Sequence, residues 1–149
     1  MNTPKREMKV LVHGISENPT KMKLRSGKFE MVIDEPQSMG GTDEGPSPVQ
    51  ALLMAEAGCL NVTGHEVARQ KGLKLNGMKI TIQGVLDPSA FMGITFEART
   101  GFQKILVTID PDFESASTED IRVWLEETEK RCPVTDNIRE KTEISVIVK

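Results

Sequence analysis

The sequence predicts an α+β domain, in which a group of antiparallel strands is followed by a long helix, further strands and a second helix. Three observations predict this class: alternating apolar and polar residues within 8–34, an uninterrupted helical stretch over about 48–71, and mixed strand and helix signals over 74–148. A chain of 149 residues fits one domain, which would bury roughly 70% of its unfolded surface. We therefore expect a single domain over residues 1–149.

Short alternating segments near the N-terminus predict a strand meander with one polar face. Residues 8–14 alternate over part of their length, and residues 21–25 and 28–33 alternate more regularly. Ser26-Gly27 joins the last two segments and is typical of a tight turn. Residues 35–46 are rich in Gly and Pro and are therefore expected to form a loop.

A long helix is predicted to begin after this loop. Ser47 can serve as the N-cap, Pro48 suits the first helical position, and Gln50 completes a capping box. No proline follows before Lys71, and Gly72 is suited to the position just past the helix end. The first half is apolar on almost every face, which places it in a core rather than on a surface.

Strand signals return after the helix. They cover residues 74–75 and 78–82, with Asn76-Gly77 expected as a turn between them. Residues 102–109 form a convincing strand, which Asp110-Pro111 is expected to end.

The C-terminal part predicts a second helix and a last strand. Ser117 and Asp120 form an N-terminal capping pattern. The helix is expected to stop at Cys132-Pro133, because proline lacks an amide donor and restricts the residue before it. A short helical turn can resume over 133–139, and the apolar segment 144–148 is expected to be a strand.

Composition excludes several classes of function. Nineteen basic and 22 acidic residues leave a net charge of −3, without a basic cluster or any Tyr, so nucleic acid is not an expected partner. No apolar stretch approaches the ~20 residues of a membrane span, and the N-terminus shows no apolar signal region. With only two cysteines, a secreted disulfide scaffold is not predicted. We expect a cytoplasmic protein.

The two cysteines leave two alternatives open when considered residue by residue. Cys59 lies within a helix among small and apolar residues, where a thiol usually packs as a small hydrophobe with a raised pKa. Cys132 precedes Pro133 at a helix break, near backbone N–H groups whose positive end lowers a thiol pKa. The thiols are therefore either inert core residues or a reactive pair.

Metal and serine chemistry lack sequence support. His13 and His65 join the cysteines without any Cys-x-x-Cys or His-x₃-His unit, so no metal site is predicted. The Gly-x-Ser-x-Gly pattern of serine hydrolases is not found in the sequence.

Four motifs together carry a resemblance to a known family. They are Gly45–Cys59, a Pro-rich entry to a long helix that reaches a small-residue run and a cysteine; Asp87–Gly93; Gly101–Ile105; and Arg131–Val134 around the second cysteine. These motifs and the spacing of the cysteines resemble the osmotically induced protein C and organic hydroperoxide resistance family (OsmC/Ohr). The resemblance runs over roughly residues 8–148, and Asp87–Gly93 is similar to an OsmC-like branch.

The resemblance implies an intertwined α+β homodimer with two central helices packed back to back. It also implies reduction of organic hydroperoxides or hydrogen peroxide, in defence against oxidative stress. Cys59 would become a sulfenic acid, and Cys132 would condense with it to a disulfide. An external dithiol would restore both thiols, and neither a metal nor another cofactor is required.

The sequence departs from the family where the thiolate is supported. Hydroperoxide-reducing members hold the thiolate with an N-terminal Arg and with a Glu at the position that Val49 occupies here. Arg25 is the candidate for the Arg, while Glu56 and Gln50 are candidates for thiolate support. Glu56 could also oppose thiolate formation by its like charge, or be a polar edge or dimer-contact residue. Gln50 is equally explained as a capping residue. The alternative function is an OsmC-like dimer without efficient turnover that binds an apolar small molecule between its subunits.

Overall fold

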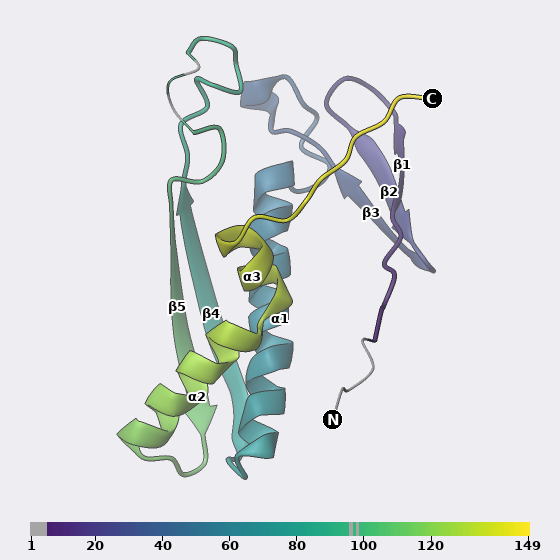
Figure 1. Cartoon of the computed structure of the whole chain (residues 1–149). Helices are drawn as coiled ribbons and strands as arrows, with labels where there is room; N and C mark the ends of the chain where they lie inside the picture. Colours follow the sequence, from purple (N-terminus) through teal and green to yellow (C-terminus); the bar gives the residue numbers. More distant parts are fainter. Residues whose placement is uncertain (1–5, 96, 98) are drawn as a thin grey trace. The chain divides into compact units, whose positions relative to one another are not determined.

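The computed structural model describes residues 6–95, 97 and 99–149 and confirms the α+β class. The chain divides into two compact units, residues 1–52 and 53–149, which are described one at a time. Its described elements are, in order, β1 (His13–Ser16), β2 (Met22–Ser26), β3 (Phe29–Ile33), the 3-10 turn η1 (Gln37–Met39), α1 (Pro48–Gln70), β4 (Leu75–Val85), β5 (Lys104–Phe113), α2 (Thr118–Arg131) and α3 (Pro133–Arg139) (Figure 1).

The N-terminal unit contains the predicted antiparallel meander, in the order β1-β2-β3. Ser26 pairs with Phe29 across a tight turn, in which Gly27 has a φ of +58°. The first strand is shorter than predicted, since β1 begins only at His13. Residues 8–12 lie outside the sheet and are exposed to solvent. An alternating pattern of apolar and polar residues does not by itself determine whether a segment such as 8–12 pairs with another strand.

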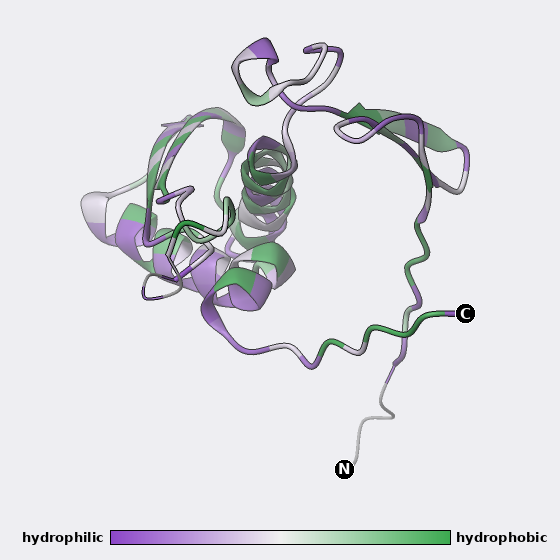
Figure 2. Cartoon of the chain, turned by 90° about the horizontal axis from the view of Figure 1, so that it is seen from above, coloured by the Kyte–Doolittle hydropathy of each residue, from purple (hydrophilic) through white to green (hydrophobic). Residues whose placement is uncertain are grey.

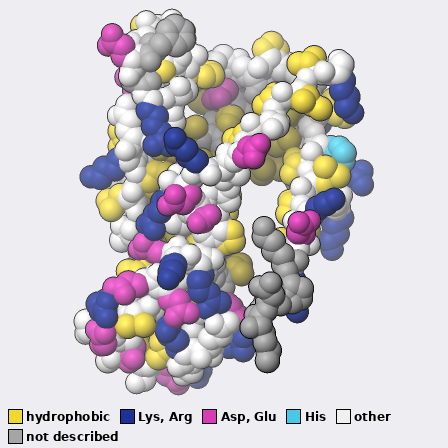
Figure 3. Space-filling view, in the orientation of Figure 1, with side chains coloured by type: hydrophobic (Ala, Val, Ile, Leu, Met, Phe, Trp, Pro, Cys, Tyr) yellow, Lys and Arg dark blue, Asp and Glu magenta, His cyan; other side chains and the backbone are white. Residues whose placement is uncertain are grey.

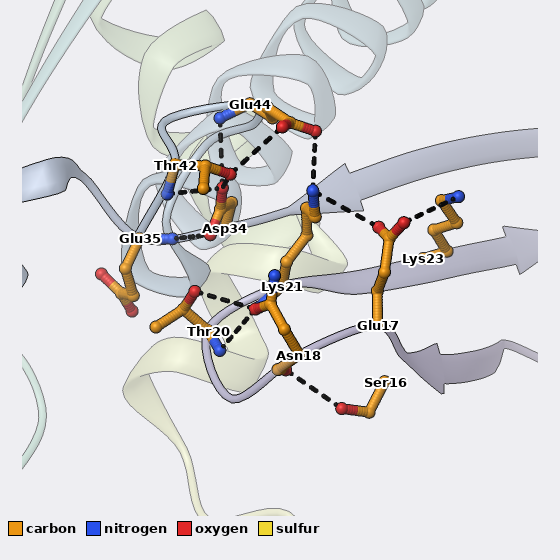
Figure 4. A network of polar contacts seen from close by, with 10 residues as sticks. All are labelled: Ser16, Glu17, Asn18, Thr20, Lys21, Lys23, Asp34, Glu35, Thr42 and Glu44. Atoms are coloured by element: carbon orange, nitrogen blue, oxygen red, sulfur yellow. Dashed lines mark hydrogen bonds and ion pairs between the residues drawn. The ribbon is translucent and has the colours of Figure 1, made fainter. Parts of the chain in front are cut away.

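The loop after β3 is held by the buried carboxylate of Asp34 (Figure 4). Its oxygens accept hydrogen bonds from the Thr42 hydroxyl at 2.7 Å and from the backbone amides of Glu35, Thr42 and Glu44 at 2.8–3.2 Å. The Thr42 hydroxyl is the largest of the influences that hold the Asp34 pKa well below its usual range. Lys21 adds an ion pair of 2.8 Å to Glu44. The loop leading to α1 is therefore ordered by polar contacts.

Both ends of α1 follow the sequence signals. The Ser47 amide donates to Gln50 Oε1 at 2.8 Å, and the Gln50 amide donates to Ser47 Oγ at 3.4 Å, which confirms the capping box. At the other end, Gly72 takes a φ of +68°, and the Leu73 amide donates to the Ala68 carbonyl at 2.9 Å. The prediction that the whole first half of α1 is buried was wrong for the single chain, because Met54 is 60% exposed.

The C-terminal unit packs around Trp124 of α2. The Trp124 indole donates a hydrogen bond of 2.7 Å to the Gly64 carbonyl on α1, and its ring meets Phe113 edge-on at 5.2 Å between centroids. Val67 and Ala68 complete the buried cluster. The Ser117–Asp120 capping box of α2 is confirmed, and the outer surface of this helix carries charges of both signs (Figure 3).

Two strand boundaries differ from the prediction. Asn76-Gly77 is not a turn but an irregularity near the start of the continuous strand β4, where the register shifts between Leu75 and Gly77. β5 does not end at Asp110-Pro111 but continues to Phe113, with Pro111 opposite Met78. A proline is compatible with a strand where the ladder does not need its missing N–H.

The predicted last strand is also absent from the described chain. Residues 140–149 form no regular element, and Ile144, Val146, Ile147 and Val148 are 80–97% exposed. Figure 2 shows hydrophobic colour along the later part of this segment, close to the C-terminus. A strand requires an adjacent edge with which to form hydrogen bonds, and no described strand of the chain pairs with this segment. None of the helices described is long and apolar enough to cross a membrane.

Candidate functional site: a pair of cysteines

Cys132 lies at the predicted break between two helices. It follows the last residue of α2 and precedes Pro133, the first residue of α3, with an extended backbone (φ −77°, ψ 113°). The break has a physical cause, since Pro133 has no N–H to donate to α2 and disfavours a helical conformation at Cys132. The Cys132 side chain is completely buried.

Cys59 meets Cys132 from the middle of α1. The two side chains are close enough for the Cys132 thiol to affect the pKa of Cys59, and both are free thiols. Cys59 is only partly buried, whereas Cys132 has no exposed surface. The structure therefore brings the two predicted catalytic cysteines together and leaves Cys59 as the one with access to solvent.

The surroundings of Cys59 favour its neutral form. Burial is the largest cause that raises the pKa of this thiol, and the neighbouring Cys132 thiol raises it further. The backbone amide of Val134 and the hydroxyl of Thr63 lower the pKa in part, because both can donate to a thiolate. Neither of these two groups that lower the pKa of Cys59 carries a positive charge.

Glu56 lies one helical turn before Cys59 and is 4% exposed. Its Oε1 accepts a hydrogen bond of 2.7 Å from the Thr135 hydroxyl on α3. Its Oε2 is buried without a hydrogen-bond partner in the described part of the chain. Thr135 is not recognisable from the sequence as a site residue, because its only signal is its place in the first turn of the helix that follows Cys132.

Gln50 and Arg25 have other contacts in the structure. The Gln50 carbonyl accepts from the Ser47 amide, which is the capping role. Arg25 lies on β2, and its Nε donates to the Gly27 carbonyl at 2.9 Å. Support of the thiolate by either residue stays a prediction.

The two histidines lie on different elements of secondary structure, His13 on β1 and His65 on α1. Within residues 6–95, 97 and 99–149, no group of three or more His, Cys, Asp or Glu side chains has the arrangement of a metal site.

The chain is thus an α+β protein that brings two free thiols together at a Cys-Pro helix break. Its sequence matches the family described as OsmC-like protein over residues 41–147, and the chain belongs to this family. No curated protein matches the sequence.

Solved structures similar to the chain carry related names. An OsmC-like protein from Mycoplasma pneumoniae has a TM-score of 0.77 and 20% identity, covering 90% of this chain and 89% of that one. A protein from Legionella pneumophila named as an organic hydroperoxide resistance protein has a TM-score of 0.66, 18% identity, and coverage of 91% and 92%. An organic hydroperoxide resistance protein from Elizabethkingia anophelis has a TM-score of 0.67, 15% identity, and coverage of 91% of both chains. At these identities the likeness shows the fold.

Proposed function

We propose that the chain is a thiol peroxidase that reduces organic hydroperoxides or hydrogen peroxide. The Cys59 thiolate attacks the O–O bond, the sulfur is oxidised to a sulfenic acid, and the peroxide is reduced to an alcohol or water. The Cys132 sulfur then attacks the sulfenic acid, a disulfide forms and water leaves. An external dithiol in a reducing cytoplasm returns both thiols by exchange.

The proximity of the two cysteines carries this proposal. It supports formation of a disulfide without a large rearrangement of the backbone, since the two sulfurs are already neighbours. The roles follow from exposure: Cys59 is accessible to a peroxide, and the fully buried Cys132 is available only to its neighbour. The names of the Legionella and Elizabethkingia proteins agree with a substrate of this class.

A cation is required to complete the site, because the pKa of Cys59 within the single chain is raised. We assign this task to Arg25, which is one of the residues lining a groove of about 1060 Å³ in the N-terminal unit. An opposite charge close to the sulfur would favour the thiolate. Replacement of Arg25 by Gln should then raise the pH at which Cys59 reacts with peroxide.

A homodimer is part of the proposal. Met54 and Val62 are 60% and 69% exposed on α1 and, with Gly58 between them at helical spacing, form an uncovered apolar stripe. The exposed apolar residues of 144–148 also lack a partner. Sedimentation should show a dimer, and the double variant Met54→Glu, Val62→Glu should sediment as a monomer. A monomeric wild-type protein would contradict this assignment.

The alternative is a dimer that binds an apolar small molecule without efficient turnover. The raised pKa of Cys59 favours it, as does Val49 at the position where peroxide-reducing relatives carry Glu. In that case, peroxide would oxidise the protein slowly, once per chain, and an excess of dithiol would not support continuing consumption.

The deciding experiment measures consumption of cumene hydroperoxide and hydrogen peroxide with dithiothreitol in excess. The wild-type protein should consume many equivalents, and Cys59→Ser should consume none. Cys132→Ser should accumulate a sulfenic acid at Cys59 that dimedone traps. Stoichiometric consumption by the wild-type protein would overturn the peroxidase and favour the alternative.

A further inference from the structure

A cavity of about 200 Å³ lies beside the thiol pair and is distinct from it, since neither cysteine lines it. It is enclosed by α1, β5, α2 and α3 within the C-terminal unit. Glu56 and Thr135 contribute polar atoms, and Ile105, Val107 and Ile109 form an aliphatic wall along β5. The cavity is therefore amphipathic.

One carboxylate in this cavity is incompletely satisfied. Glu56 is 96% buried, its Oε1 is occupied by the Thr135 hydroxyl, and its Oε2 has no partner in the described residues. A buried carboxylate oxygen without a donor is costly, and proteins normally provide a hydrogen bond or a cation for it. Glu56 lines the cavity, but its Oε2 has almost no accessible surface there. A rotation about the last side-chain torsion, which is soft in Glu, would present this oxygen to a molecule inside that supplies the missing donor.

The charges around the cavity indicate which donor fits. Arg139 and Glu129 also line it, and they form an ion pair of 2.8 Å with partly exposed side chains. The Arg139 charge is thereby matched by Glu129, which leaves Glu56 as the unmatched charge of the lining. An anion would meet this carboxylate unfavourably, whereas a cation would compensate it.

We propose that this cavity binds a small primary alkylammonium ion. The ammonium group donates to Glu56 Oε2, and the alkyl chain lies along the wall of Ile105, Val107 and Ile109. A water molecule occupies about 30 Å³ in the liquid, so the volume accommodates several waters or a short amine of about four to six carbons. The site is independent of peroxide reduction and would persist in a chain that lacks the reactive thiol.

The test is titration calorimetry of the full-length protein with n-butylammonium and n-hexylammonium chloride, with tetramethylammonium chloride as the ionic control and n-butanol as the uncharged analogue. We expect saturable binding of the primary amines and none of tetramethylammonium, which has no N–H to donate. Glu56→Gln should weaken amine binding by about tenfold or more, since a charged hydrogen bond is lost, and should leave the weak binding of butanol unchanged.

Two further variants keep the result interpretable. Val107→Phe should abolish binding by filling the cavity, even if Glu56→Gln is too unstable to measure. Glu126→Gln, on the outer side of α2 where Glu126 pairs with Arg122, should leave the affinity unchanged. Cys59→Ser should bind the amine as the wild-type protein does, which separates this site from the peroxidase. No saturable binding, or equal affinity of the wild-type protein and Glu56→Gln, would overturn the proposal and leave water as the occupant.

Discussion

Thr135 donates a hydrogen bond of 2.7 Å to the buried carboxylate of Glu56 and so connects α3 to α1. The same two helices hold the cysteine pair, since Cys59 lies one turn after Glu56 and Cys132 immediately precedes α3. The contact therefore fixes the relative position of the backbone segments that carry both sulfurs. It also explains how a carboxylate is retained in a largely apolar interior.

Removal of this donor should destabilise the protein. Thr135→Val preserves the shape of the side chain but leaves both oxygens of Glu56 without a partner, which costs about 1–3 kcal/mol. Urea denaturation should show the loss as a lower midpoint with an unchanged slope. Thr135→Ser keeps the hydroxyl and is the matched control, expected to lie close to the wild-type protein. Equal midpoints for the Val and Ser variants would contradict the role of the hydrogen bond.

The lowered pKa of Asp34 in the folded state leads us to expect that the protein loses stability in acid. The folded state holds its pKa below the ordinary value, chiefly through the Thr42 hydroxyl and the amides around it. A depressed folded pKa contributes stability above the unfolded pKa of about 3.9, and this contribution is lost as the pH falls through the folded value. We expect the free energy of unfolding to decrease steadily below about pH 4. Thermal melts across this range measure it.

Asp34→Asn is the corresponding variant. It should be less stable than the wild-type protein at neutral pH, because the amide cannot accept all of the hydrogen bonds that the carboxylate accepts. Its stability should also change less between pH 5 and pH 3. An unchanged acid dependence would assign the acid sensitivity to other carboxylates, among which Glu66, held by Arg69 to a pKa of about 2, is the first candidate.

Local chemistry predicted the features that depend only on neighbouring residues. The capping boxes at Ser47 and Ser117 and the helix break at Cys132-Pro133 are confirmed, since each is decided within three or four residues. The proximity of Cys59 and Cys132, in contrast, could not be predicted from neighbouring residues. Spacing alone left the thiols inert or reactive, and only the family resemblance implied that they meet.

Features that depend on distant partners were not predicted. Asn76-Gly77 is typical of a turn, but pairing with β5 keeps it inside a strand. Residues 144–148 have the composition of a strand, but the described chain offers them no edge. Thr135 could not be recognised either, because its significance comes from a carboxylate 79 residues earlier in the chain.

Gly64 predicts a packing limit at the core of the C-terminal unit. A Cβ at this position would lie 2.9 Å from Met78 Cε and 3.0 Å from Trp124 Cζ2. Gly64→Ala should therefore lose about 1–3 kcal/mol of stability through overpacking, although alanine favours a helix. Gly77→Ala is the control, because a Cβ there meets nothing within 4 Å. Urea denaturation of both variants should show a loss only for Gly64→Ala, and a stabilised Gly64→Ala would show that the core has room.

The groups around Cys59 predict opposite effects of two substitutions on its reactivity. Because the Cys132 side chain raises the pKa of Cys59, Cys132→Ser should shift alkylation of Cys59 to lower pH. Because the Thr63 hydroxyl lowers that pKa, Thr63→Val in the same Cys132→Ser background should shift alkylation back to higher pH. The rate of iodoacetamide labelling between pH 6 and 11, followed by mass spectrometry, measures both shifts. Since the thiolate is the reacting species, each profile reports the ionisation of a single sulfur. Identical profiles for the two variants would mean that Thr63 does not donate to Cys59, and the thiolate would then depend on the Val134 amide and on a cation.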